Sequence, residues 1–248
     1  MTMTRIDFIK CIAALPLVSC ESPQLDYGKA VRFEMSISKL SLKERLALLK
    51  EAGFDGVEMN SGSYKIEEVS NAARSESMKI VSIENTGQWS SPLNHRGVTV
   101  RNAAVDSLKR AVEEALKLEA EFVSTVPGVR LPDEDGGSFE RAVSSLNKVL
   151  PMLNGTDLKL VLQNSCSGFS DNAEVMAKLI NALENSSTGV CLDLTSASKD
   201  KSDWIELLGP KILTVHNQKF TDSGNLNCNW KILDGYGGDA DLLKDMAG

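Results

Sequence analysis

Histidine and cysteine are scarce in this sequence of 248 residues, and their scarcity excludes several kinds of site. There are 2 histidines and 5 cysteines, and no two cysteines have the C-x-x-C spacing of a zinc or redox motif. We therefore expect neither a cysteine-based metal site nor a disulfide framework. A G-x-S-x-G elbow is also lacking, so a serine hydrolase of that kind is not expected.

Positive charge is in short supply as well. Lys and Arg together number 27 against 34 Asp and Glu, which gives a net charge of −7. A protein that binds a nucleic-acid duplex needs a cationic surface to displace counterions, so nucleic acid is not the expected partner. The hydrophobic fraction of 42% and the charged fraction of 25% are ordinary for a soluble globular protein.

No apolar run is long enough to cross a bilayer, but the N-terminus has the features of a bacterial export signal. A charged start precedes the short apolar segment Cys11–Val18, and Leu17-Val18-Ser19-Cys20 fits a lipobox. This order predicts that residues 1–25 are an export signal and that Cys20 is lipidated. The protein would then be periplasmic or a membrane-anchored lipoprotein, touching the membrane only through its lipid. An irregular N-terminal helix is the alternative.

Short apolar strands alternate with amphipathic helices along the rest of the chain. The strands are predicted at Val31–Met35, Asp55–Met59, Lys79–Glu84, Glu121–Val126, Asp157–Asn164, Gly189–Asp193 and Ile212–His216. Helices are predicted between them, the first with a capping box that begins at Ser41. Strict alternation without a composition break predicts parallel strands in one domain, residues 26–248, and favours a (β/α)8-type TIM barrel over a doubly wound sheet.

The seven predicted strands leave the barrel one short. A Gly-rich loop, Gly235–Gly238, and a last helix, Asp239–Met246, are expected after the seventh strand. The eighth strand would follow Met246, but the sequence stops at Gly248. We expect either a barrel that is open by one strand or a truncated gene product.

Three of the strands end in side chains of the kind that bind metals or substrates. The fifth, sixth and seventh strands end at Gln163, Asp193 and His216. Because the carboxyl ends of parallel strands meet at one end of a barrel, we expect these side chains to form an active-site rim. The alternatives are a satisfied core histidine for His216 and a helix cap for Asp193.

Several motifs in this order resemble the xylose-isomerase-like barrel superfamily, which contains sugar-phosphate isomerases and epimerases, hydroxypyruvate-isomerase-like proteins and endonuclease IV-type proteins. They are GFDGVEM (53–59), VPG (126–128), LVLQN (160–164), VCLDL (190–194) and GYGGDAD (235–241). The resemblance covers roughly residues 30–246 and implies a TIM barrel with its site at the carboxyl ends of the strands.

The resemblance also implies a divalent metal, which in this family is usually held by Glu, Asp, His and Glu from strands five to eight. Gln163, Asp193 and His216 would be the metal ligands here, with Mn, Zn, Co or Mg as the metal, and Gln163 and His216 would hold the catalytic positions. Gln163 replaces the first Glu, so it has no charge and cannot accept a proton. The second Glu has no counterpart. We therefore expect weakened metal binding, or loss of the metal.

By the same resemblance the chain would be an isomerase or epimerase for a small sugar or sugar derivative. The reaction would be metal-assisted proton transfer next to a carbonyl, through an enediolate. Glu58, Gln88, Trp89 and Lys219 would contact the substrate, although Glu58 has the alternative of a solvated acid and Trp89 that of loop packing. Because two acids are missing, a second hypothesis is a degenerate barrel that binds carbohydrate without turnover. An endonuclease IV-type nuclease needs more ligands and a basic groove, and ranks last.

Overall fold

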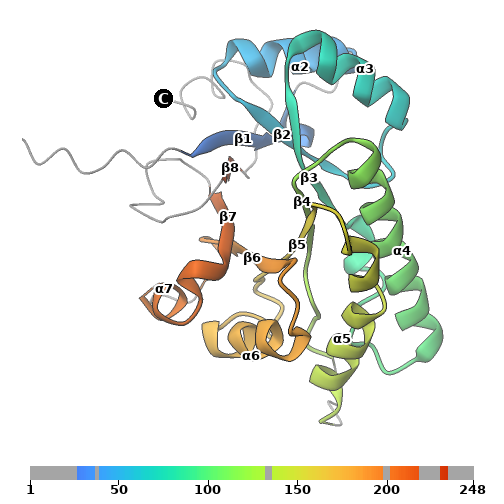
Figure 1. The fold of residues 1–248 in the computed structure, drawn as a ribbon, viewed down its shortest axis with the longest axis vertical. Helices are drawn as coiled ribbons and strands as arrows, with labels where there is room; N and C mark the ends of the chain where they lie inside the picture. Colours follow the sequence, from blue (N-terminus) through green and yellow to red (C-terminus); the bar gives the residue numbers. More distant parts are fainter. Residues whose placement is uncertain (1–26, 37–38, 132–135, 198–201, 218–229, 234–248) are drawn as a thin grey trace, which may run out of the picture.

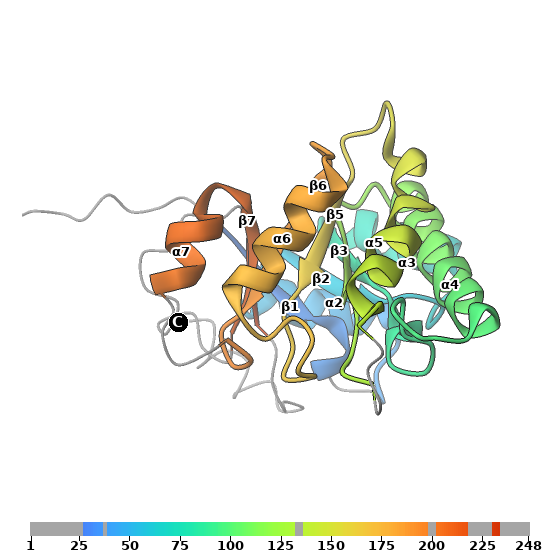
Figure 2. The same cartoon turned by 90° about the horizontal axis from the view of Figure 1, so that it is seen from below.

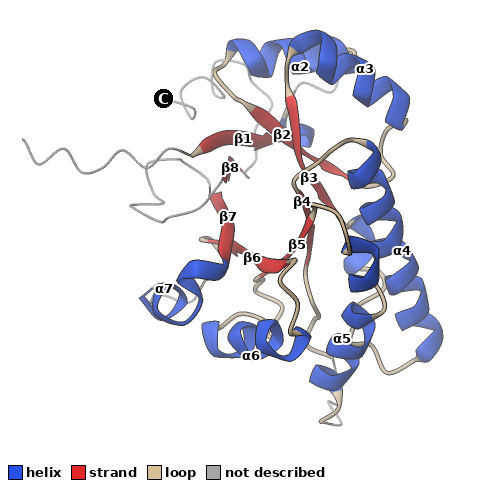
Figure 3. Ribbon diagram, in the orientation of Figure 1, coloured by secondary structure: helices blue, strands red, loops and turns tan. Residues whose placement is uncertain are grey.

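Eight parallel strands form a closed barrel in sequence order. The computed structural model describes residues 27–36, 39–131, 136–197, 202–217 and 230–233, and Figure 3 shows the strands as a central ring. The strands are β1 (Gly28–Arg32), β2 (Gly56–Asn60), β3 (Lys79–Glu84), β4 (Phe122–Thr125), β5 (Lys159–Gln163), β6 (Thr188–Asp193), β7 (Ile212–Asn217) and β8 (Trp230–Leu233). The predicted fold class is confirmed. The predicted export segment with Cys20, the Gly-rich loop and the last helix lie outside the described residues.

Helices connect successive strands from β1 to β7 and cover the outside of the ring (Figure 1 and Figure 2). They are α2 (Leu42–Glu51), α3 (Ile66–Glu76), α4 (Val98–Lys117), α5 (Ser138–Asn147), α6 (Ala173–Leu183) and α7 (Ser202–Leu208), with 3-10 turns at Phe33–Met35, Thr86–Gln88, Leu150–Leu153 and Gly209–Lys211. The predicted capping box is present, because Ser41 and Glu44 each accept a hydrogen bond from the other's backbone amide. No helix in the described part of the chain is long and apolar enough to span a membrane.

The inside of the barrel has an apolar lower layer and a polar upper layer. The lower layer is a buried cluster of Ala30, Val81, Phe122, Val161, Cys191, Trp230 and Ile232. Above it, toward the carboxyl ends of the strands, Glu58, Ser124, Gln163 and His216 are buried. These four side chains contact one another across the ring from strands that are not neighbours, so they point inward. The barrel is therefore a packed core below and a polar site above.

The expectation that strand eight is missing is wrong. β8 pairs with β7 on one side and with β1 on the other, so that Trp230 lies beside both Thr214 and Gly28. Its four residues include the charged Lys231, and so short a strand leaves a weak sequence signal. A side chain at Gly28 would overlap the Trp230 ring, so the closing pair of strands depends on glycine at this position.

The first strand lies earlier in the chain than the predicted Val31–Met35. β1 ends at Arg32, and Phe33–Met35 turn into a 3-10 helix. Arg45 of α2 holds this turn, because its guanidinium donates to the Phe33 carbonyl at 2.8 Å and to Ser36 Oγ at 2.7 Å. The same guanidinium lies 3.8 Å from the centre of the Phe33 ring. Packing against α2 thus overrides the alternating pattern that predicted a strand here.

Candidate functional site

A polar pocket lies at the carboxyl ends of the strands, where the sequence predicts the site. Its volume is ≈ 560 Å³, which is within the usual range for small-molecule sites. Side chains from β1, β2, β3, β5 and β6 and from the loops after them line it. The polar ones include Arg32, Asn60, Glu84, Gln163, Asn164, Ser165, Ser167, Asp193 and Ser196.

Below the pocket, Glu58 and His216 form a buried carboxylate–imidazole pair. Glu58 Oε1 lies 3.2 Å from His216 Nε2, and the two side chains are 1% and 0% exposed. Ser124 Oγ donates a hydrogen bond of 3.1 Å to the other carboxylate oxygen of Glu58. Burial raises the pKa of Glu58, but the charge and hydrogen bond of His216, with the nearby Arg32, outweigh it and hold that pKa below its ordinary value. Glu58 is therefore ionised. It is not among the side chains that line the pocket.

Gln163 separates this pair from the pocket. Its amide Nε2 lies 3.4 Å from His216 Nδ1, and its side chain also lines the pocket. Gln163 is 7% exposed, and its Oε1 is buried with no hydrogen-bond partner in the protein. A buried amide oxygen without a partner in the protein can accept a hydrogen bond from a ligand hydroxyl. The structure therefore brings Gln163 and His216 together, as predicted, with Gln163 on the ligand side.

Asp193 lies next to His216 in the sheet, but its carboxylate turns into its own loop. Oδ1 accepts hydrogen bonds from the backbone amide and the hydroxyl of Thr195, at 2.8 and 2.7 Å. Oδ2 accepts one from Ser196 Oγ at 2.7 Å. The Asn164 side chain forms two hydrogen bonds with the Asp193 backbone, donating to its carbonyl at 2.9 Å and accepting from its amide at 2.6 Å. The carboxylate thus caps the turn directly after β6 and not the next helix, which begins at Ser202, while the residue stays at the pocket wall.

The loop after β3 supplies the two other predicted contacts, and they differ in exposure. Trp89 lines the pocket and is 58% exposed, so its ring is open to a ligand. Gln88 is buried, and its Oε1 accepts a hydrogen bond of 2.6 Å from the amide of Val126. Its Nε2 donates to Glu84 at 3.1 Å. Gln88 therefore supports the pocket wall, and the predicted contact Lys219 lies outside the described residues.

Three pocket residues on β1, β2 and β3 were missed from the sequence. Arg32 forms an ion pair with Glu84 and donates to Asn60 Oδ1 at 3.1 Å. Arg32, Asn60 and Glu84 are the last residues of β1, β2 and β3. The signal that picked out Gln163 and His216, a polar side chain at a strand end, also marks these three residues.

The described side chains do not fit the metal that the resemblance implies. Of the three expected ligands, Gln163 is neutral and Asp193 is engaged by Thr195 and Ser196. His216 Nε2 lies against the carboxylate of Glu58. No group of three His, Cys, Asp or Glu side chains that could hold a metal ion occurs in the described part of the chain. We therefore derive no chemical step through a metal.

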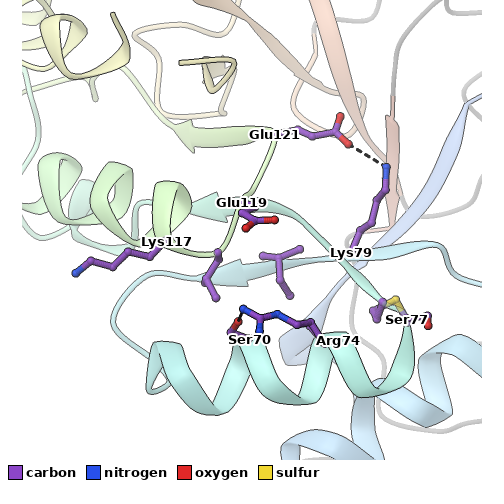
Figure 4. Close-up of a pocket in the computed structure, with 11 residues that line it drawn as sticks. Ser70, Arg74, Ser77, Lys79, Lys117, Glu119 and Glu121 are labelled. Carbon is purple, nitrogen blue, oxygen red and sulfur yellow. Dashed lines mark hydrogen bonds and ion pairs between the residues drawn. The ribbon is translucent and has the colours of Figure 1, made fainter. Parts of the chain in front are cut away.

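A second hollow, of ≈ 340 Å³, lies at the opposite end of the barrel, where β3 and β4 begin. Figure 4 shows Arg74 of α3 reaching Ser70 and Lys79 reaching Glu121. The first pair is a hydrogen bond of 2.8 Å, and the second is an ion pair of 3.5 Å between side chains that are 67% and 40% exposed. Exposed pairs of this kind contribute little, and this end of a TIM barrel serves stability. We place the functional site at the carboxyl end.

Comparison with known proteins identifies related sequences and folds. The family model for the xylose isomerase-like TIM barrel matches residues 46–229. An AP endonuclease of family 2 from Brucella melitensis superposes with a TM-score of 0.73 and 17% identity, over 88% of this chain and 97% of that one. D-psicose 3-epimerase from Clostridium cellulolyticum H10 with D-tagatose gives 0.71 and 14%, over 89% and 95%. L-ribulose 3-epimerase gives 0.71 and 15%, over 88% and 90%. Comparison with curated proteins gives no significant match.

Proposed function

Because the chain belongs to the xylose isomerase-like TIM barrel family, we propose that its pocket binds a small sugar or sugar derivative. The observation that carries the proposal is the combination of an open aromatic ring, Trp89, with amide, hydroxyl and carboxylate groups around a cavity of ≈ 560 Å³. A sugar offers an apolar ring face for the indole and several hydroxyls for the polar groups. D-Psicose 3-epimerase with D-tagatose has the same fold, which supports this choice of ligand class.

The described side chains favour binding over metal-assisted turnover. Proton transfer beside a carbonyl needs a group within hydrogen-bond reach of the substrate that can accept the proton. Glu58 and His216 are buried below Gln163, and the Asp193 carboxylate is engaged in its loop. Glu84 lines the pocket but is paired with Arg32. Gln163 itself cannot take a proton. The chain would therefore be a sugar-binding member of an isomerase and epimerase family.

A second candidate, sugar isomerase or epimerase activity, is favoured by one specific observation. Asp193 and His216 are register partners at the ends of β6 and β7, as a strand-end site requires. In this reading Asp193 leaves its loop when substrate binds. Catalytic hydrogen bonds that are long without substrate can shorten when substrate binds, so isomerase or epimerase activity needs its own test.

Two measurements separate the candidates. Thermal unfolding is followed with a panel of ketoses and aldoses, including D-tagatose, and a sugar present at about 100 times its Kd adds about 2.7 kcal/mol to the unfolding free energy. Exchange of sugar α-protons with solvent deuterium is then followed with and without Mn²⁺ or Co²⁺. We expect stabilisation without exchange. Exchange that depends on the enzyme would favour the second candidate, and a panel without any stabilising sugar would contradict the proposal.

A further inference from the structure

The buried Glu58 carboxylate lies beside groups that can compensate for its charge. A carboxylate with 1% exposure is costly to bury unless an opposite charge and hydrogen bonds compensate for it. Ser124 donates a hydrogen bond to one carboxylate oxygen of Glu58, and His216 Nε2 lies 3.2 Å from the other. Arg32, the cation nearest above, is paired with Glu84. The described polar layer thus places one carboxylate beside the His216 imidazole and one beside the Arg32 guanidinium.

Gln163 is the neutral member of this layer. It contacts His216 on the side of the imidazole away from Glu58, through Nδ1 rather than Nε2. A carboxylate at position 163 would place a second acid against the same imidazole, in a region where no further cation is described. Like charges that share a buried site repel each other unless a cation lies between them. A neutral amide is the side chain that leaves the charge of this layer unchanged.

We propose that the Glu58 carboxylate occupies the place of a divalent metal ion beside His216, so that this polar layer forms without a metal. A neutral amide at position 163 then avoids a second acid against the same imidazole. The proposal concerns the floor of the barrel and does not rest on which ligand the pocket binds. Its tests measure metal binding and stability, so they can fail independently of the sugar experiments.

The first test is thermal unfolding of the purified full chain in EDTA and with Mn²⁺, Co²⁺ or Zn²⁺. The wild-type midpoint should be the same in all four conditions, and its metal content by mass spectrometry should be well below one ion per chain. Glu58→Gln leaves His216 without its acid and should lower the midpoint by roughly 6–15 °C. Glu68→Gln is the matched control, because it removes an exposed carboxylate paired with Lys65, and it should change the midpoint little.

The second test adds a carboxylate at position 163 or moves it there from position 58. Gln163→Glu places a second carboxylate beside His216, so this variant should unfold at a lower temperature in EDTA and recover with Co²⁺ or Mn²⁺. The double variant Glu58→Gln/Gln163→Glu restores one acid to one imidazole and should be more stable in EDTA than Gln163→Glu alone.

Two outcomes would overturn the proposal. One is a wild-type chain that binds Co²⁺ stoichiometrically, or gains stability from it, and loses that response in Glu58→Gln. The other is a Gln163→Glu chain whose midpoint equals that of the wild type in EDTA and does not change with metal. The Gln163→Glu measurement remains decisive if Glu58→Gln fails to fold.

Discussion

Trp89 is the side chain whose position bears most directly on ligand binding. It comes from the loop after β3, lines the pocket and is 58% exposed, whereas Trp204 and Trp230 are buried. The ring contributes little to folding and is free to stack on a ligand.

Trp89→Ala should weaken sugar binding by roughly 5- to 30-fold, because it removes about 1–2 kcal/mol of aromatic contact. Trp89→Phe keeps a ring and should retain most of the affinity. Calorimetric titration with a stabilising sugar measures both variants, and their thermal midpoints should match the wild type. Unchanged affinity in Trp89→Ala would mean that the ring only packs its loop.

Glu58 gives the fold a pH dependence whose sign is fixed by its pKa. That pKa lies below its ordinary value of 4.5, because His216 and Arg32 outweigh burial. A carboxyl of this kind stabilises the fold at pH above its unfolded value, and the contribution is lost as the pH falls through the folded value.

The stability difference between wild type and Glu58→Gln should therefore be fully present above pH 4.5 and should shrink as the pH falls below 4.5. Urea unfolding at a series of pH values measures it, with Glu68→Gln as the control for removal of an acid. A difference that stays constant down to low pH would contradict an ionised Glu58 in the folded chain.

At the scale of elements, the closure of the barrel depends on the short strand β8. Trp230 fills the lower layer and lies against Gly28 of β1, and its indole nitrogen donates to Glu121 at 2.9 Å. The contact joins the first and last strands of the ring. The closing pair of strands therefore depends on the close approach of the Trp230 ring to the Gly28 backbone.

Gly28→Ala should lower the unfolding free energy by about 1–3 kcal/mol, because the added methyl group overlaps the Trp230 ring. Gly209→Ala is the matched control, since the nearest atom to a methyl group there is 3.9 Å away, at Ile205. Chemical denaturation measures both variants. Equal stability of the two would mean that β1 and β8 are not tightly apposed at this point.

At the scale of the whole molecule, the repeated strand–helix pattern determines most of what can be predicted from the sequence. Continuous apolar runs such as Lys79–Glu84 and Ile212–His216 predict strands that the structure contains. β8 has only four residues, which is too short to give such a signal. The register of β2 against β3 shifts between Val57 and Glu58, and such a shift is set by strand pairing and not by local sequence.

The sequence predicts where the candidate site lies better than it predicts the contacts within the site. Polar residues at strand ends indicate the region where Gln163 and Asp193 line one pocket, with His216 just below it. Trp89, in the loop after β3, is expected from the resemblance and lines the same pocket. The same pattern does not distinguish a carboxylate that faces a ligand from one that caps its own turn, as Asp193 does. That choice depends on the backbone of residues 194–196, where tertiary geometry decides between two favourable hydrogen-bond patterns.

The N-terminal segment is expected to direct the whole protein to a membrane surface. We propose that Cys20 of the lipobox is lipidated after export, because the charged start, apolar segment and small-residue cleavage site occur in the expected order. Cys20→Ala should abolish incorporation of labelled palmitate in a bacterial host and release the protein from the membrane fraction. Cys11→Ala, within the segment that would be removed, is the control and should be labelled like the wild type. Equal labelling of both variants would contradict the lipobox.

The central claim is that the polar end of this barrel is a sugar pocket above a floor that needs no metal. Calorimetric titration of the wild-type chain with a stabilising sugar, first in EDTA and then with Mn²⁺ or Co²⁺, tests it most directly. We expect the same Kd in both conditions, because the proposed ligand contacts are Trp89 and the polar side chains of the pocket wall, with no metal among them. Binding that disappears in EDTA and returns with the metal would contradict it.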